Sequence, residues 1–450
     1  MGQIAQQLLA LNSAKHAIRQ AINDKGGGPL SKGAPLSAYP AAIEAIPTGS
    51  DAAKTVVFYD YDGTEVISYS VEDFLALEAM PENPIHDGLT AQGWNWTLAD
   101  AKTYVQKYGV LHVGQMYKPT DGKLHLSIVL SKDLNLGIRV SGTVDWGDGS
   151  APQRVTSQGS HTYAQAGAYE VTVEGVTNIP DSMLNGCYSL QSLLIPDTVT
   201  SIGANAFKNC YSLQSVIIPS GVTSIGDSAF YDCYALKSVV IPDTVSTVSS
   251  SAFYYCYSLQ VAVIPNGIRT IPSYAFIGCS LKSVVLPESV TSIANEAFYN
   301  STLFSVVIPD RVTSISGTAF SACKFKHFTI PDGVTSVSTK QFQNCRCLES
   351  IVLPDTVTSI GSTAFSGCQS LKYVEIQDGV TSIGASAFSN CTSLKVVCKA
   401  VTPPTLGTNA FIAQNPVSIY VPDSVVADYK AATHWAAFAD IIFPISALTD

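Results

Sequence analysis

The chain is organised by the stretch IPDTVTSIGANAFKNCYSLQSVIIPSGVTSIGDSAFYDCYALKSVVIPDTV at residues 195–245, where one pattern occurs twice and begins again. The pattern extends from about residue 177 to residue 400. A proline after an apolar run recurs every 22 or 23 residues, at Pro196, Pro219, Pro242, Pro265, Pro287, Pro309, Pro331 and Pro354. A phenylalanine keeps the same interval, at Phe207, Phe230, Phe253, Phe276, Phe298, Phe320, Phe342, Phe365 and Phe388. With an imperfect first copy around Leu184, the sequence holds ten copies.

A repeat of this length cannot bury its apolar side alone, so neighbouring copies are expected to stack into a solenoid. Leu213, Val216 and Ile218 predict a short strand, which Pro219 ends because proline has no N–H for the next ladder bond. Residues 222–225 predict a second short strand. The repeated phenylalanine is expected to point inward from a helical or 3₁₀ turn.

The repeated Leu, Pro, Phe and Cys positions resemble the BspA-like leucine-rich repeat family over about half of the chain. The resemblance implies a leucine-rich-repeat solenoid at residues 177–400 and a role in binding. The overall prediction is a mainly β protein with some α-helix, built from about ten repeats of 22–23 residues. N-terminal helices, a small α+β module and a β-sandwich module are expected to precede this solenoid.

Cysteine accompanies the phenylalanine, three residues after it in nearly every copy. The positions are Cys187, Cys210, Cys233, Cys256, Cys279, Cys323, Cys345, Cys368 and Cys391, with Ser301 in the remaining copy. Stacking places such side chains about 4.8 Å apart and pointing the same way, which is poor disulfide geometry. We therefore expect a ladder of buried thiols. Cys347 and Cys398 fall outside the pattern.

Composition bounds the possible functions. The chain has 450 residues, 13% charged residues and a net charge of −10, which argues against a nucleic-acid partner because phosphate binding needs clustered Lys and Arg. No apolar run approaches the length of a membrane span, so no membrane insertion is expected. Gln3, Gln6 and Gln7 interrupt the N-terminal apolar residues, so the sequence as given predicts synthesis in the cytoplasm without a signal peptide.

Residues 1–47 predict two helices. In the first, residues 3–24, apolar side chains alternate at intervals of four and three residues, with Lys15 as the one polar seam position. The seam residues are Ile4, Leu8, Leu11, Ile18 and Ile22. These residues could be the seam of a coiled coil, for which we expect a homo-trimer. Alternatively, they could be the apolar face of an ordinary amphipathic helix that packs on its own chain. The segment is similar to the N-terminal part of phage tail and baseplate-associated proteins, which implies attachment to other tail proteins.

Two modules are predicted before the repeats. Residues 54–120 predict a small α+β module with a hairpin around residues 60–63 and a helix capped by Thr97. Residues 121–176 predict strands at 124–130, 137–146 and 169–174. The runs VDWGDGS and HTYAQAGAYEVTVEG resemble the polycystic-kidney-disease (PKD) β-sandwich family, with the final strands missing and the solenoid stacked directly on the module.

The WGDG turn of this module carries two carboxylates, Asp145 and Asp148. They could be calcium ligands, but short acidic side chains more often accept hydrogen bonds from the backbone of such a turn. No other metal site or cofactor is predicted, because none of the seven histidines has metal-ligand spacing with a cysteine or an acid.

After residue 400 the repeat ends and residues 401–450 predict a cap: a last anchor at Phe411, a strand at 418–421 and a helix at 424–433. The run IYVPDSVVADYKAATHWAAFADIIFPI resembles the C-terminal cap of BspA-like proteins, which implies a complete C-terminal end.

Two surface features could bind a partner. Tyrosine follows the ladder cysteine at Tyr188, Tyr211, Tyr234 and Tyr257, and further tyrosines lie nearby at Tyr231, Tyr254, Tyr255 and Tyr274. They could form a recognition surface for sugar rings or a protein, or a stack that only stabilises the loops.

The second feature is the outward position of each longer strand. These positions are Leu194, Ile217, Val240, Val263, Val285, Val307, Thr329, Val352, Glu375 and Cys398. Another layer of the same chain could cover them, or strand propensity alone could explain the aliphatic residues.

The sequence shows no plausible pairing of nucleophile and base, no phosphate-binding loop and no paired-carboxylate cleft. We therefore expect no enzymatic activity. The preferred hypothesis is a component of a phage tail, or of a tail-like particle, that contacts a bacterial surface glycan or protein through its solenoid. The alternative is a bacterial cell-surface BspA-like adhesin that binds host proteins or glycans.

Overall fold

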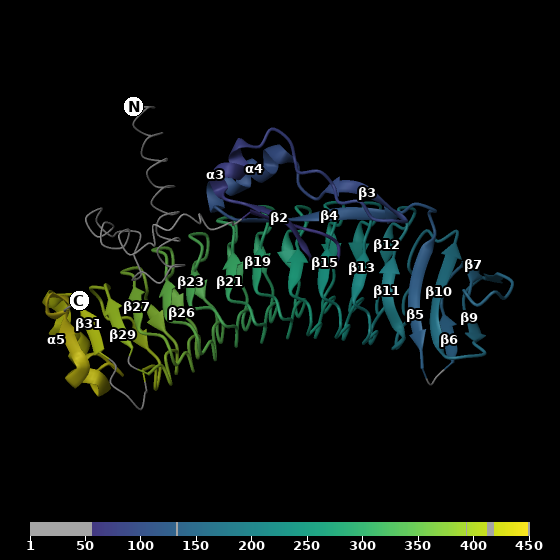
Figure 1. Ribbon diagram of the computed structural model, residues 1–450. Coiled ribbons are helices and arrows are strands. Elements are labelled where there is room, and N and C mark those ends of the chain that lie inside the picture. Colours follow the sequence, from purple (N-terminus) through teal and green to yellow (C-terminus); the bar gives the residue numbers. More distant parts are fainter. Residues whose placement is uncertain (1–55, 132–133, 393, 412–417, 449–450) are drawn as a thin grey trace. The chain divides into compact units, whose positions relative to one another are not determined.

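The computed structural model describes residues 56–131, 134–392, 394–411 and 418–448. These residues fall into an N-terminal unit, residues 56–290 with 300–307, and a C-terminal unit, residues 291–299 with 308–448. Figure 1 labels their elements. The predicted helices of residues 1–47 and the seam residues Ile4, Leu8, Leu11, Ile18 and Ile22 lie outside the described residues.

In both units each copy of the repeat supplies one longer strand, a turn and a two-residue strand. The longer strands of the N-terminal unit are β11 (Leu190–Leu194), β13 (Ser215–Ile217), β15 (Ser238–Val240), β17 (Val261–Val263), β19 (Ser283–Val285) and β21 (Ser305–Val307). Its short strands are β12 (Ser201–Ile202), β14 (Ser224–Ile225), β16 (Thr247–Val248) and β18 (Thr270–Ile271). Pairing is parallel and in register, as between Leu193 of β11 and Val216 of β13. The predicted pair of strands in each copy is confirmed.

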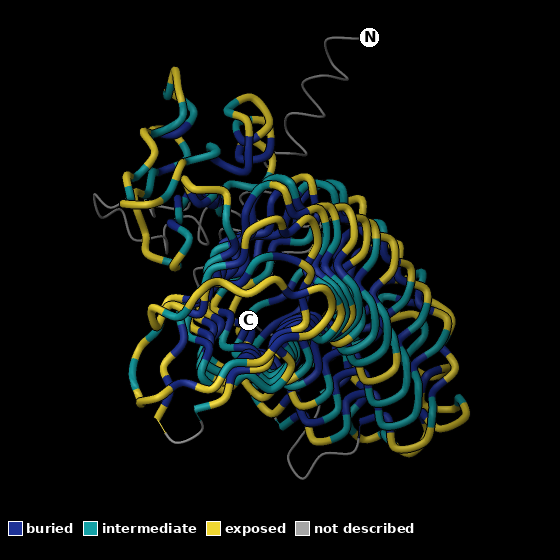
Figure 2. Tube along the Cα trace, turned by 90° about the vertical axis from the view of Figure 1, so that its right-hand side faces the viewer, coloured by how far each residue is buried: buried dark blue, intermediate teal, exposed yellow. Residues whose placement is uncertain are grey.

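The repeated phenylalanines form the centre of each unit. Phe230 and Phe253 stack with ring centroids 5.4 Å apart, and Phe342 and Phe365 stack at 5.5 Å. Buried residues lie on the inner side of the stacked turns and exposed residues follow the outer bends (Figure 2). The inward direction predicted for phenylalanine is therefore confirmed.

The ladder cysteines are free thiols with a defined bonding role. Each buried thiol donates to a backbone carbonyl of the preceding copy, as Cys256 does to the carbonyl of Phe230 at 3.2 Å. Ser301, in the copy that lacks cysteine, donates to the carbonyl of Phe276 at 2.6 Å. The position thus needs a small buried side chain that can donate one hydrogen bond, and both residue types satisfy it.

The N-terminal unit begins its repeats on a preceding sheet. Strands β5 (Leu124–Leu130), β7 (Gly142–Asp145), β8 (Gln153–Val155) and β10 (Gly167–Glu174) continue into the repeats in the order β13-β11-β5-β10-β7-β8. β5 pairs antiparallel with β11, so the first repeat strand joins the preceding module directly. Strands β6 (Asn135–Ile138) and β9 (Gly159–Thr162) form a separate pair.

The single strand predicted at 137–146 is wrong. The segment forms two strands in two different sheets. β6 ends at Ile138 and pairs with β9, whereas β7 begins at Gly142 and pairs with β8 and β10. Between them Arg139 donates its backbone N–H to the carbonyl of Met183. Partners far along the chain therefore divide a segment that has continuous strand propensity.

The small module has the sheet order β2-β1-β4-β3. Its strands are β1 (Val56–Tyr59), β2 (Glu65–Tyr69), β3 (Leu89–Trp94) and β4 (Leu111–Pro119), and its helices are α3 (Val71–Ala76) and α4 (Leu98–Tyr108). The Thr97 side chain caps α4 by accepting from the backbone N–H of Asp100, and Gly109 ends the helix in the left-handed conformation. The predicted hairpin and capped helix are confirmed.

The C-terminal unit continues the repeat with β20 (Ser292–Ile293) and β22 (Ser314–Ile315). Its longer strands are β23 (His327–Thr329), β25 (Ser350–Val352), β27 (Tyr373–Ile376) and β29 (Lys395–Cys398), and its other short strands are β24 (Ser336–Val337), β26 (Ser359–Ile360), β28 (Ser382–Ile383) and β30 (Thr405–Leu406). The sheet ends with β31 (Ser418–Val421) and β32 (Ile442–Pro444). Helix α5 (Val426–Ala431) and three 3₁₀ helices, η2 (Asp423–Val425), η3 (Ala436–Ile441) and η4 (Ile445–Ala447), complete the cap.

The cap covers the last phenylalanine of the stack. Phe411 stacks on Phe388 at 5.4 Å and meets Phe438 edge-on at 5.7 Å. Trp435 is fully buried beside Phe411 and donates its indole N–H to the carbonyl of Pro404 at 2.7 Å. The predicted anchor at Phe411 and the predicted strand at 418–421 are confirmed, and the helix is shorter than the predicted residues 424–433.

Candidate binding surface

Four tyrosines that follow the ladder cysteines lie side by side on the surface of the N-terminal unit. Ring centroids are 4.8 Å apart between Tyr188 and Tyr211, 4.6 Å between Tyr211 and Tyr234, and 5.1 Å between Tyr234 and Tyr257. The first two pairs are stacked and the third is tilted by 35°. We call these four residues the tyrosine row. Tyr188, Tyr211 and Tyr257 are 59%, 37% and 48% exposed.

A second group of tyrosines lies beside this row. Tyr231 stacks on Tyr254 at 4.5 Å, and Tyr254 contacts Tyr255 at 4.3 Å. Tyr255 also stacks on Tyr257 of the row at 5.2 Å. The structure therefore joins seven of the eight predicted tyrosines into one cluster, while Tyr274 lies on the next copy with 38% exposure.

Two of these tyrosines have unusual backbone conformations. Tyr255 has φ 53° and Tyr274 has φ 61°, in the left-handed region that bulky residues rarely adopt. At the position of Tyr255 the neighbouring copies carry Asn209, Asp232 and Gly278, which adopt this conformation more easily. The same two positions are left-handed in other copies, for example at Glu296 and Ala322, so this conformation belongs to the repeat and the two tyrosines conform to it.

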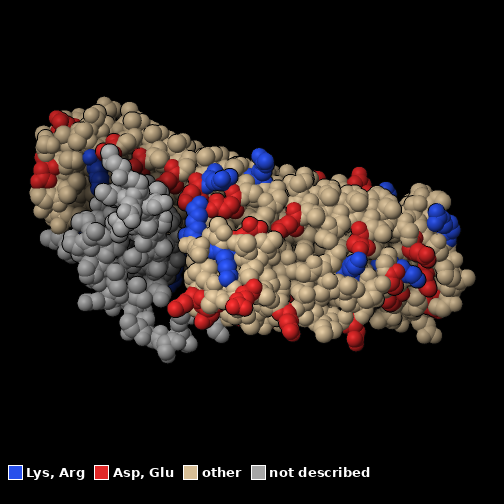
Figure 3. Space-filling view, turned by 90° about the horizontal axis from the view of Figure 1, so that it is seen from above, with Lys and Arg blue, Asp and Glu red and all other residues tan. Residues whose placement is uncertain are grey.

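The cluster has one charged side chain of each sign beside it, Lys208 and Asp232. The Lys208 ammonium lies 4.5 Å from the centre of the Tyr231 ring, a cation–π contact. Burial, followed by the nearby charge of Asp232, raises the pKa of Tyr234 to about 12, so its phenol remains protonated. On the face seen in Figure 3, Lys or Arg and Asp or Glu side chains lie in mixed groups, with neutral surface between the groups.

The outward positions of the repeat strands have a different role in the N-terminal unit. β4 runs across β13, β15, β17 and β19 (Figure 1). The side chains at these positions, Ile217, Val240, Val263 and Val285, are buried. Val285 belongs to the same core as Phe58, Trp96 and Tyr104 of the small module. The hypothesis that another layer of the chain covers the aliphatic residues is therefore confirmed for these four strands.

Polar contacts fix the small module on the strands. Lys118 at one end of β4 pairs with Asp197 at 2.5 Å, and Lys107 of α4 pairs with Glu288 at 2.7 Å. The Tyr104 hydroxyl donates to the carbonyl of Leu286 at 2.6 Å. The sequence alone predicted no role for residues 54–120 beyond that of a spacer. The signal that could have identified one was the need to cover the aliphatic outward positions.

One outward residue was assigned wrongly. Cys398 pairs with Ile376, which points inward, and it is buried against the Tyr429 hydroxyl at 3.2 Å. Val397 pairs with Glu375 and takes the outward place. The error arose because this copy has no proline to mark the end of its strand.

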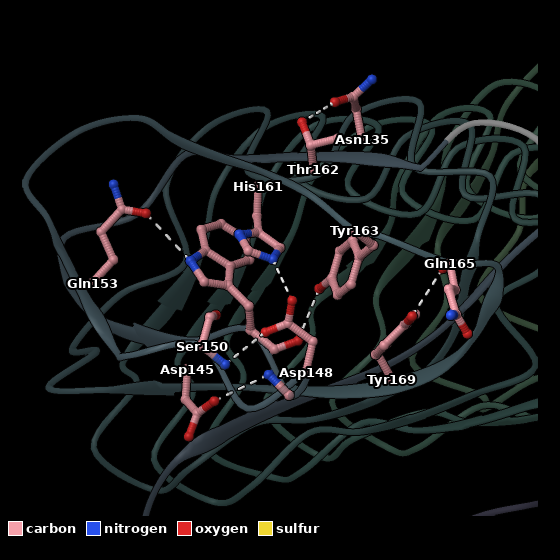
Figure 4. Close-up of polar contacts among 12 residues, drawn as sticks. Asn135, Asp145, Asp148, Ser150, Gln153, His161, Thr162, Tyr163, Gln165 and Tyr169 are labelled. Atoms are coloured by element: carbon pink, nitrogen blue, oxygen red, sulfur yellow. Dashed lines mark hydrogen bonds and ion pairs between the residues drawn. The ribbon is translucent and has the colours of Figure 1, made fainter.

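The carboxylates of the WGDG turn are engaged with the backbone and a histidine (Figure 4). Asp145 accepts from the N–H of Gly147 at 3.0 Å, and Asp148 accepts from the N–H of Ser150 at 3.0 Å. Asp148 also contacts His161 at 2.7 Å, and the His161 ring stacks on Trp146. The turn thus uses its acids as backbone acceptors. Among the described residues no group of three or more His, Cys, Asp or Glu side chains is arranged to hold a metal ion.

The helices of the described ranges include none with the length and apolar character needed to span a bilayer.

Comparison with known proteins then identifies the repeat. The family described as BspA type leucine rich repeat region (6 copies) matches residues 177–304 and 291–418. No curated protein matches the chain.

Among solved structures, a leucine-rich repeat protein from Bacteroides ovatus is 25% identical, covering 60% of this chain and 87% of that one with a TM-score of 0.41. A leucine rich cell surface protein from Faecalibacterium prausnitzii is 28% identical, covering 57% and 85% with a TM-score of 0.35. Since the family match spans more than half of the residues, the chain belongs to the BspA type leucine-rich repeat family.

Proposed function

We propose that the chain is a non-enzymatic adhesion protein that contacts a glycan or protein through the tyrosine cluster of its N-terminal unit. The observation that carries the proposal is the exposed tyrosine row, which places large amphipathic rings at 4.6–5.1 Å intervals. Tyrosine provides rigid contact area together with a polar hydroxyl, which suits recognition surfaces.

The repeat family is compatible with an adhesin on a bacterial surface, so we place that role first. The phage-tail role depends on the resemblance of residues 1–47, which lie outside the described part of the chain. In either setting the solenoid would present the tyrosine cluster, and a trimer formed through residues 3–24 would raise the avidity of weak contacts. The PKD-like module would then act as the support on which the repeats begin.

The proposal is tested with the full chain and a Tyr188→Ala, Tyr257→Ala double variant. Binding to bacterial cells and to surfaces coated with host matrix proteins is measured by flow cytometry and surface plasmon resonance. We expect at least a tenfold loss of binding, because exposed aromatic anchors carry much of the energy of an interface. Phe304→Ala is the matched control, since Phe304 is an exposed ring outside the cluster. Equal binding by the double variant and the parent chain would refute the proposal.

A further inference from the structure

The stacking within the tyrosine row determines which ring faces a ligand can reach. Tyr211 has a tyrosine ring on each side, so its faces are covered and its edge remains. Tyr188 begins the row and is its most exposed member at 59%; Tyr257, at the other end, is 48% exposed. Tyr257 has Tyr234 on one side and the stacked Tyr255 ring on the other, so the row offers a ring face at Tyr188 and phenol edges from Tyr211 to Tyr257.

The repeat changes length where the row ends. The copy that follows Tyr257 is one residue shorter, with Ser280 directly between Cys279 and Leu281, so no tyrosine continues the row. Ser280 donates its hydroxyl to the carbonyl of Tyr257 at 2.5 Å. In the same copy Gly278 has no side chain, and a Cβ there would lie 2.6 Å from the Tyr255 ring. Gly278 thus leaves room for the Tyr255 ring against the backbone of this copy.

The spacing of the rings bears on the kind of ligand. In an extended peptide, side chains on one face recur about every 6.6 Å, which does not match rings 4.6–5.1 Å apart. A sugar chain presents flat C–H faces that suit an open aromatic face, and it carries hydroxyls that can both donate to and accept from phenols. Asp232 and Lys208 carry opposite charges beside the row, so the site has no excess positive charge that would favour an anionic ligand.

We propose that the tyrosine row is a site for a neutral carbohydrate chain, with one sugar ring on the open face at Tyr188 and sugar hydroxyls along the phenol edges of Tyr211, Tyr234 and Tyr257. This inference rests on the proposed function and adds the ligand class. Tyr255, held by Gly278, widens the end of the site at Tyr257.

The probe is an array of neutral hexasaccharides built from glucose, mannose, galactose or N-acetylglucosamine, with sulfated hexasaccharides as the anionic arm. The full chain is expected to bind at least one neutral member and no sulfated one. For the bound member, Tyr257→Ala and Tyr188→Ala each weaken affinity about tenfold in calorimetry, and Phe304→Ala leaves it unchanged. Tyr211→Phe keeps the stack but removes a hydroxyl, so it weakens affinity by a smaller factor.

The outcomes separate the ligand class from the proposed function. Tyrosine-dependent binding to a protein-coated surface, with no neutral hexasaccharide bound, would refute the carbohydrate and leave the adhesion surface standing. A hexasaccharide bound equally well by the Tyr188→Ala, Tyr257→Ala chain would place the sugar elsewhere and overturn this site. If neither sugar, cell nor protein binding depends on these tyrosines, the proposed function fails as well.

Discussion

The same strand position carries different residues in the two units. In the N-terminal unit it is aliphatic on β13, β15, β17 and β19, and β4 lies across it. In the C-terminal unit the position holds Thr329, Val352, Glu375 and Val397 in turn, and Glu375 pairs with Lys399. The backbone pairing is parallel in both units, so strand formation does not require aliphatic residues at this position.

The difference shows that different contacts determine the residue type at the inward and the outward positions of the repeat. The inward residues meet the same neighbours in every copy and therefore vary little. The outward residue varies more. Under β4 it is Ile or Val throughout, since burying an aliphatic side chain contributes about 1.5–3 kcal/mol, whereas in the C-terminal unit buried Val352 and Val397 alternate with Thr329 and Glu375. Small residues on β4 complete the fit, because a Cβ on Gly114 would lie 2.6 Å from Val240.

The inward layer should respond equally in both units. Phe298→Ala in the C-terminal unit and Phe253→Ala in the N-terminal unit each empty a fully buried position, and each should lower the free energy of unfolding by about 3–5 kcal/mol. Urea denaturation measures the effect, with Phe304→Ala as the exposed control. A change below about 1 kcal/mol for either buried phenylalanine would contradict the inward assignment.

The cover in the N-terminal unit should weaken in acid. His112 of β4 lies 3.4 Å from the Ser283 hydroxyl of β19, and burial lowers its pKa to about 4. Because the pKa in the folded chain is below that of the free side chain, about 6.5, the stabilising neutral form is complete above pH 6.5 and is lost as pH falls toward 4. Protonation should cost up to about 3 kcal/mol.

Hydrogen exchange of β1 and β4 at pH 7 and pH 4.5 measures this loss of protection. The variant His112→Gln removes the titrating group, and it should show less dependence on pH than the parent chain. Equal pH dependence in the two chains would assign the effect to other groups.

Close packing between β4 and β15 gives a smaller effect. Gly114→Ala should destabilise the N-terminal unit by about 1–3 kcal/mol, because the added methyl overlaps Val240. Combining it with Val240→Ala should recover part of the loss. Gly137→Ala is the matched control, since a Cβ there meets nothing within 4 Å. Thermal unfolding of the four chains decides whether the contact controls stability.

The cysteine ladder should behave alike in both units. Cys256→Ala removes one of the two donors to the buried carbonyl of Phe230, which keeps the backbone N–H of Cys233, and should cost about 1 kcal/mol. Cys256→Ser should cost less, because Ser301 already makes the equivalent bond. The pair Cys368→Ala and Cys368→Ser repeats the comparison in the C-terminal unit, where the acceptor is Phe342. Denaturation midpoints in which serine is no better than alanine would contradict the hydrogen-bonding role.

The parts of the fold that could be predicted are those with local signals. Thr97, Gly109 and the regular Pro and Phe intervals each act within a few residues or recur at a fixed period. The placement of β4 could not be derived, because β4 carries His112, Gly114 and Lys118 toward the repeats and has no apolar alternation on that side. The tyrosines could be identified from their regular spacing in the sequence. Which ring face stays open to solvent depends on how the rings stack, and the spacing does not predict that.

The smallest expected effect concerns two cysteines of one copy. Cys345 is buried, donates to the carbonyl of Phe320 at 3.1 Å, and has its pKa raised by burial to about 12. Cys347, two residues later, is exposed. A thiol reagent should therefore modify Cys347 in the folded chain and reach the ladder thiols only after unfolding, because the thiolate is the reactive form.

Since all eleven cysteines are free, reductant should leave the unfolding free energy unchanged. Mass spectrometry of the labelled, non-reduced chain identifies both the modified cysteines and any disulfide. A disulfide between ladder positions would contradict the assignment of these cysteines as free, hydrogen-bonding thiols.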